Sequence, residues 1–210
     1  MIQFRCGLFA TFFTISVILS ASITQVRATE FANGAEKFIS SLASKAEVSL
    51  LSEKISAAEH QRRFRELMLD SFDLKGVGKW VIGRYWRRIS KSERTKYLSL
   101  FEEFIVATYS KRFRGYTKAK LQINGTTQGK NSVFVNSQIN REGGKPIRVV
   151  WRVKVSNGKY KIVDIIIEGV SWIRTQRSEF VSVIRNSGGK ISGLMKALRK
   201  KIVYLTNSKD

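Results

Sequence analysis

The chain has 210 residues, including 38 Lys or Arg and 16 Asp or Glu, which gives a formal net charge of +22. Its 43% hydrophobic residues are enough to build a core, so the composition excludes wholesale disorder. A single Cys and a single His exclude a disulfide framework and a Cys-based zinc finger, and they argue against a His-rich metal centre or a catalytic triad. The charge favours a partner that carries phosphate, either nucleic acid or membrane headgroups.

The first 28 residues have the pattern of a secretory signal peptide. Arg5 precedes an apolar stretch over residues 7–19, and Val26-Arg27-Ala28 places small residues where a signal peptidase reads them. We predict cleavage after Ala28, which leaves residues 29–210 as a single α+β domain with a net charge of +20 and no Cys. A signal anchor is the alternative, because the uncharged stretch over residues 6–26 is long enough to span a bilayer.

Helical spacing of apolar residues dominates the first half of the remaining chain. It predicts a helix over residues 31–46, a second helix opened by the capping box Ser56-x-x-Glu59, and a third opened by Ser90-x-x-Glu93. The third has a wide apolar stripe that runs from residue 97 to residue 113. His60 falls in the first turn of a basic helix, where we expect it to face solvent.

From residue 119 the apolar period changes to two, which predicts four strands near residues 121–123, 133–139, 147–155 and 163–167. Short turns separate them, and Asn157-Gly158 is the strongest hairpin signal. The strands should form an antiparallel meander with one apolar face, since the opposite face of the third strand carries Arg148, Arg152 and Lys154. Two amphipathic helices follow, over residues 173–184 and 191–202. The expected fold is therefore α+β, with helices covering the apolar face of the sheet and enclosing a hydrophobic cavity.

Residues for catalysis are scarce, and we expect neither a catalytic residue, nor a metal, nor a cofactor. Asp164 and Glu168 share a strand face, but such pairs are usually surface charges, and Ser171 is better explained as a helix N-cap than as a nucleophile. The basic residues are spread along the chain instead of being interleaved with exposed aromatics. This pattern argues against nucleic-acid binding and leaves two readings, a solvated basic surface or a patch that faces a membrane or a partner.

Several motifs together resemble the MlaC/toluene-tolerance family of periplasmic phospholipid-binding proteins. They are Phe72-Asp73, Val81-Ile82-Gly83-Arg84-Tyr85-Trp86, residues 101–109, residues 160–164, Glu168-Gly169-Val170-Ser171 and Arg177-Ser178-x-Phe180. The resemblance covers roughly residues 34–200. Two positions depart from the family pattern: Tyr160 stands where Trp is frequent, and Val163 where an aromatic is common. These departures bear on subgroup and ligand, because hopanoid-associated relatives share the pattern.

The resemblance implies a periplasmic carrier, and not an enzyme, for phospholipid with two acyl chains. Such a carrier, an auxiliary component of an ABC transporter, moves lipid between an outer-membrane lipoprotein complex and an inner-membrane ABC transporter complex. It thereby maintains outer-membrane lipid asymmetry and contacts membranes only transiently. Alternatives are a hopanoid or other apolar-ligand carrier of the same family, a secreted cationic binder of nucleic acid or acidic polymer, and a periplasmic hydrolase.

Two sets of residues are candidates for the site that this function requires. The first lies on predicted inward stripes near the motifs and is expected to line the lipid cavity, although each member could equally be core: Val81, Tyr85, Phe104, Tyr109, Val135, Val149, Trp151, Ile165 and Ile167. The second flanks Tyr85-Trp86 and is expected to contact a partner or lipid headgroups: Arg84, Arg87 and Arg88.

Overall fold

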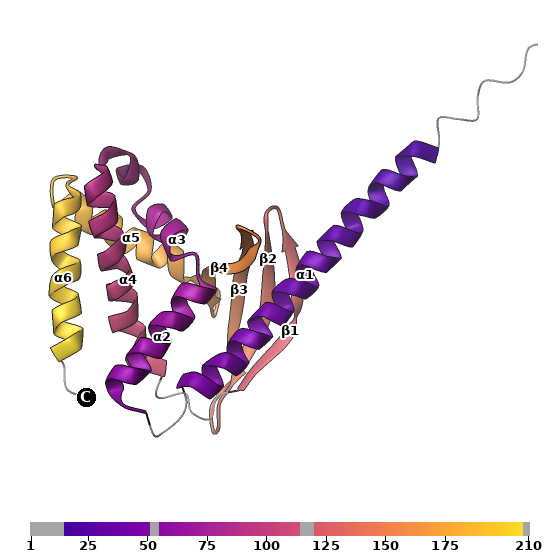
Figure 1. The fold of residues 1–210 in the computed structure, drawn as a ribbon, viewed down its shortest axis with the longest axis horizontal. Helices are drawn as coiled ribbons and strands as arrows, with labels where there is room; N and C mark the ends of the chain where they lie inside the picture. The colour runs from indigo at the N-terminus through magenta and orange to yellow at the C-terminus, as the bar shows by residue number, and fades with distance from the viewer. Residues whose placement is uncertain (1–14, 51–54, 114–119, 208–210) are drawn as a thin grey trace, which may run out of the picture.

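The computed structural model describes residues 15–50, 55–113 and 120–207, in which a helical layer stands beside an antiparallel sheet (Figure 1). Residues 1–14, the first half of the predicted export segment, lie outside the described residues. The helices are α1 (Ile15–Leu50), α2 (Ala57–Ser71), α3 (Leu74–Ile82), the short 3₁₀ helix η1 (Gly83–Arg88), α4 (Lys91–Phe113), α5 (Trp172–Asn186) and α6 (Ile191–Asn207). The strands are β1 (Lys120–Gly129), β2 (Ser132–Asn140), β3 (Ile147–Ser156), β4 (Lys159–Ile167) and β5 (Val170–Ser171).

The sheet is the expected antiparallel meander, with strand order β1-β2-β3-β4-β5. Asn157 and Gly158 both adopt positive φ angles, as the predicted tight hairpin turn between β3 and β4 requires. The prediction of four strands was wrong by one. The chain turns at Glu168 and Gly169, both at positive φ, and β5 then pairs with the end of β4 for two residues. A strand of two residues is too short to show an alternating pattern in the sequence.

Both predicted helix starts are confirmed, and they differ in detail. The backbone N–H of Glu93 donates to Ser90 Oγ (3.2 Å) and the backbone N–H of Ser90 donates to the Glu93 carboxylate (2.8 Å), which completes a capping box at α4. At α2, Ser56 Oγ accepts from the backbone N–H of Glu59 (3.2 Å), but the Glu59 carboxylate accepts from Arg62 and Arg63 instead of closing the box. The two reciprocal bonds are thus present only at α4.

Helix α3 and the turn that follows it were not predicted from the sequence. Asp73 caps α3 by accepting from the backbone N–H of Gly76 (2.9 Å). Gly78 lets α3 approach α4 closely, because a Cβ there would lie 3.0 Å from side-chain atoms of Leu98 and Phe101. The Tyr97 hydroxyl on α4 donates to the Gly78 carbonyl (2.9 Å), and burial raises the pKa of Tyr97 above its ordinary value, so it remains a neutral donor.

The apolar interior is divided between the two layers. One cluster is formed by α3, η1, α4, α5 and α6, and a second by α1 and the sheet (Figure 1). A small third cluster joins the end of α1 to α2 and α4 through Leu50, Phe64 and Val106. His60 was expected to face solvent but is 2% exposed, because α2 turns this side of its first turn towards the interior.

Among the helices of the described residues, none is long and apolar enough to cross a bilayer. Nor do the described His, Cys, Asp and Glu side chains gather in a group of three or more that could hold a metal ion.

Candidate binding site

One face of the sheet carries three rows of paired side chains. The register sets Val133 opposite Val153, then Val135 opposite Trp151 and Trp151 opposite Ile165. The third row pairs Ser137 with Val149 and Val149 with Ile167. Since alternate residues of a strand point to the same face, the rows form one apolar strip that crosses β2, β3 and β4.

Exposure rises across this strip towards β4. Val133 and Val153 in the first row are fully buried. In the second row Val135 is buried whereas Trp151 and Ile165 are half-buried, and in the third row Ser137 and Val149 are buried whereas Ile167 on β4 is 47% exposed. Helix α1 explains the gradient, because Ala35 and Ile39 pack against the first-row residues and Val135, while Phe31 and Phe38 stack on Tyr160 of β4 (5.6 and 6.0 Å between ring centroids). The apolar face therefore extends beyond the part packed into the fully buried cluster.

A short hydrogen-bond chain fixes the middle of the strip. The Trp151 indole N–H donates to Ser137 Oγ (2.9 Å), and the buried Ser137 hydroxyl donates to the Val149 carbonyl (2.8 Å). This arrangement satisfies the polar atom of Trp151 within the sheet and leaves its ring as an apolar surface on the strip.

The nine predicted lining residues do not form one wall. Val135, Trp151 and Ile165 belong to the sheet cluster, and Val149 and Ile167 lie on the same sheet face. The other four belong to the helical layer: Val81, Tyr85 and Phe104 are buried in its cluster, and Tyr109 packs at its edge, where its hydroxyl accepts from the Trp172 indole N–H. The sequence pattern identifies all nine as inward-facing but does not separate the two layers.

Asp164, expected at the surface, is 5% exposed. Its carboxylate accepts from the Ser171 hydroxyl (2.6 Å) and from the backbone N–H of Ile173 (3.0 Å), and Ser171 Oγ caps α5 as predicted by accepting from the backbone N–H of Arg174 (3.3 Å). The burial follows from the turn at Gly169, which brings the start of α5 back over β4. Asp164 thus has a structural role, as a second cap of α5.

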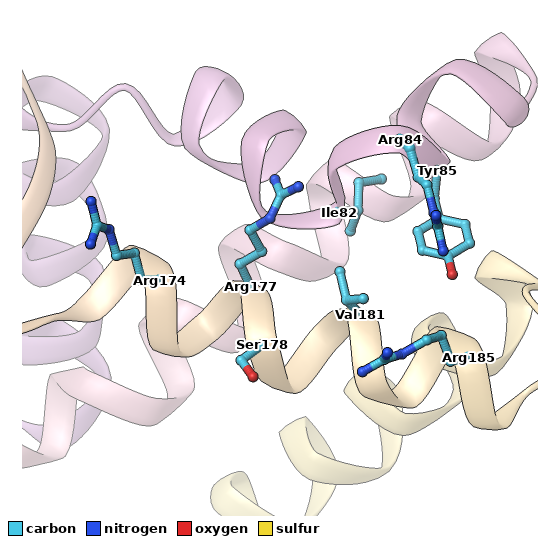
Figure 2. A pocket seen from close by; sticks show the side chains of 8 residues that line it. All are labelled: Ile82, Arg84, Tyr85, Arg174, Arg177, Ser178, Val181 and Arg185. Carbon is cyan, nitrogen blue, oxygen red and sulfur yellow. The ribbon is translucent and has the colours of Figure 1, made fainter.

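A polar pocket of about 440 Å³ lies between η1 and α5, away from the sheet strip (Figure 2). Its lining combines four guanidinium groups with a Ser hydroxyl and a small apolar wall: Arg84, Arg174, Arg177, Arg185, Ser178, Ile82, Tyr85 and Val181. Of the three arginines predicted to contact a partner, Arg84 lines the pocket, whereas Arg87 and Arg88 are exposed outside its lining. Arg84 and Arg88 both lie over the Tyr85 ring, at 5.4 and 5.9 Å from its centroid.

The three pocket arginines of α5 were missed by the sequence analysis. Arg174, Arg177 and Arg185 recur with Ser178 and Val181 at spacings of three, four and seven, which places them along one face of a helix. This periodicity is readable in the sequence. Their proximity to Arg84, some ninety residues earlier, depends on the packing of α3 against α5 and cannot be predicted from the sequence.

The sequence profile of the MlaC protein family matches residues 36–200. This chain belongs to the MlaC family. The match includes every element from the last 15 residues of α1 to the middle of α6, and it contains all the predicted site residues.

Two relatives add detail to the family assignment. The chain is 26% identical over 129 residues to the intermembrane phospholipid transport system binding protein MlaC of Haemophilus influenzae, an alignment that spans 59% of this chain and 60% of that protein. The fold is similar to that of a phospholipid-binding protein from Ralstonia solanacearum, solved in complex with a phospholipid. That similarity has a TM-score of 0.74 at 18% identity and covers 82% of this chain and 99% of the other. At this identity, the structural match establishes the α+β fold alone.

Proposed function

We propose that this protein is a phospholipid carrier of the periplasm, not an enzyme, and that it binds acyl chains against the graded apolar face of its sheet. The observation that carries the proposal is the strip itself, which opens as it crosses from β2 to β4: Val135 and Val149 are buried, Ile165 is half-buried and Ile167 is 47% exposed. Membership of the MlaC family and the phospholipid named for both relatives support lipid as the ligand. An apolar path from the core to the surface suits an acyl chain that must enter and leave the protein.

The energetics also suit a carrier. Moving an acyl chain from water to such a surface is favourable by about 0.8 kcal/mol per buried CH₂. Relative to a bilayer the net change is close to zero, because both environments are hydrocarbon. The carrier can therefore accept lipid at one membrane and release it at the other without a large net change in free energy.

Export is part of this proposal. The leader is removed after Ala28, and Phe31, Ala35 and Ile39, which pack against the sheet, all follow this position, so cleavage leaves their contacts intact. N-terminal sequencing of the secreted product should give Thr29. An intact Met1 in the membrane fraction would contradict this step.

The proposed partners are an inner-membrane ABC transporter complex and an outer-membrane lipoprotein complex, between which the carrier moves phospholipid to maintain outer-membrane lipid asymmetry. Arg84, Arg87 and Arg88 are exposed on η1, where they are available to acidic surfaces or headgroups. Reversing these three charges should slow association with the transporter's periplasmic domain at low salt and leave lipid already bound in place. Association at the wild-type rate across a salt series would exclude η1 as the contact.

The lipid itself is tested by extraction. Protein purified without detergent should yield about one diacyl phospholipid per chain by mass spectrometry; a hopanoid in its place would identify the alternative ligand of the family. Ile167→Asn should reduce this loading severalfold. Val203→Asn on α6 is the matched control, since Val203 is 58% exposed and lies outside the sheet. Extracts without lipid, or equal loading of the two variants, would overturn the proposal.

A further inference from the structure

The pocket between η1 and α5 concentrates positive charge without compensation. Arg84, Arg174, Arg177 and Arg185 all line a space of about 440 Å³, with Arg174 at the end farthest from Arg84 and Arg185 (Figure 2). Among the described residues none of the four forms an ion pair with a carboxylate. On α2, by contrast, the charge of Arg62 is compensated by ion pairs with both Glu59 and Glu66. Four like charges around one space repel one another unless an anion occupies it.

Two of the four guanidinium groups are held in place by the protein. Arg177 donates to the Trp80 carbonyl and lies over the Trp80 ring, 4.6 Å from its centroid. Its position requires Gly83, which adopts φ +54°, because a Cβ there would lie 2.5 Å from the Arg177 guanidinium. Arg84 is stacked on Tyr85. Pre-positioned guanidinium forks lose little side-chain entropy on binding an anion.

We propose that this pocket binds a phosphate group. Guanidinium forks bind phosphate oxygens in pairs, and a phosphate with up to two negative charges and three free oxygens can accept from several forks at once. The apolar wall of Ile82, Tyr85 and Val181 lies beside the arginines and suits the carbon attached to a phosphate ester. A phospholipid headgroup and soluble phosphate share this chemistry.

The exposed Trp80 next to the pocket favours the lipid source. Trp80 is 43% exposed, and its ring is held by Arg177 at the pocket's edge. Trp rings concentrate at the interface between lipid and water, where neighbouring Arg side chains reach phosphates. The inference is independent of the path of the acyl chains, since the pocket lies outside the sheet strip.

The first experiment titrates inorganic phosphate into the full-length mature protein, with binding followed by calorimetry. The variant R174Q/R185Q removes the two pocket arginines that hold no other described element. It should weaken phosphate binding by about tenfold or more, as expected for the loss of charge-assisted hydrogen bonds. The control R199Q/K200Q removes the same charge from exposed positions on α6 and should bind phosphate within about twofold of wild type. Equal losses in both variants, or no loss in the first, would overturn the proposal.

The second experiment distinguishes the source. Phosphatidylcholine vesicles containing a minor fraction of phosphatidic acid should bind the wild type and the α6 control, and R174Q/R185Q should bind several times more weakly. Loss of phosphate binding with unchanged vesicle binding would support a site for soluble phosphate. If instead an acidic peptide binds through the two arginines and phosphate fails to displace it, the pocket recognises a protein and the proposal is wrong. Lipid extracted from the same preparations reports separately on the carrier function.

Discussion

The helical cluster and the sheet face use similar residues to opposite effect. In the helical layer, Tyr97 and Phe101 are fully buried, and Phe101 meets the Phe180 ring edge-on at 6.1 Å. On the sheet, apolar side chains pass from burial at Val135 and Val149 to half exposure at Ile167 as the rows reach β4. Packing against several helices fixes the first region, whereas the second is closed on one part only, by α1. The difference shows that a stripe of apolar residues is accessible to a ligand only where its helical cover ends.

This contrast predicts that truncation to Ala lowers the free energy of unfolding much more in the helical cluster than on the sheet strip. Phe101→Ala should lower the free energy of unfolding by about 3–5 kcal/mol, because it leaves a cavity among Tyr97, Phe180 and the close contact at Gly78. Ile167→Ala should cost about 1 kcal/mol or less, since its side chain already meets water. Urea unfolding of lipid-free protein measures both. Similar costs would show that the sheet strip is as tightly packed as the helical core and would remove the basis for the contrast.

The middle of the strip can be tested through its polar chain. Ser137→Ala removes the acceptor of the Trp151 indole N–H and should destabilise the protein by about 1–3 kcal/mol. The freed ring should also change its fluorescence maximum and the loading of lipid. Ser137→Thr, which retains the hydroxyl, is the matched control and should bring back most of the indole signal. An unaltered fluorescence spectrum in Ser137→Ala would show that the bond does not orient Trp151.

Local signals in the sequence identified most elements, and tertiary packing decided the rest. The alternation over residues 133–139 and 147–155, the Asn157-Gly158 turn and the Ser90 capping box each depend on neighbours in the chain, and each is present. Helix α3 has a local signal in its Asp73 N-cap, but Gly76 and Gly78 within its nine residues lower the helix propensity of the segment, and β5 is too short to show a period.

The candidate site divides in the same way. Inward-facing residues were recognised by their period, including Trp151 and Tyr85, but their separation into two clusters depends on which helix covers which part of the sheet. The arginine pocket brings Arg84 close to residues about ninety positions later. Both the two clusters and the pocket depend on contacts between residues distant in the sequence, so the sequence pattern does not reveal them.

The junction between the two regions is the start of α5, where Ser171 bonds to both α5 and Asp164 of β4. Ser171→Ala should cost about 1 kcal/mol as the loss of a helix N-cap. The loss is limited because Asp164 still accepts from the backbone N–H of Ile173. Thermal unfolding of Ser171→Ala and Ser171→Thr measures the difference. A loss as large as that of Phe101→Ala would mean that the junction, and not the helical cluster, controls stability.

The smallest expected effect concerns acid and the helix that covers the sheet. Hydrogen bonds from Arg62 and Arg63 lower the pKa of Glu59 from 4.5 to about 2, and Arg63 also donates to the Ser49 carbonyl near the end of α1 (3.3 Å). A carboxyl whose pKa is lower in the folded state stabilises that state above pH 4.5, and this contribution is lost as the pH falls towards 2. Glu59→Gln should therefore flatten the fall in melting temperature over this window and leave the helical cluster unaffected. Because Glu59 is at the surface, added salt should shrink the difference between variant and wild type. Curves that remain parallel from pH 4.5 down to 2 at low salt would show that Glu59 does not couple α2 to the cover of the sheet.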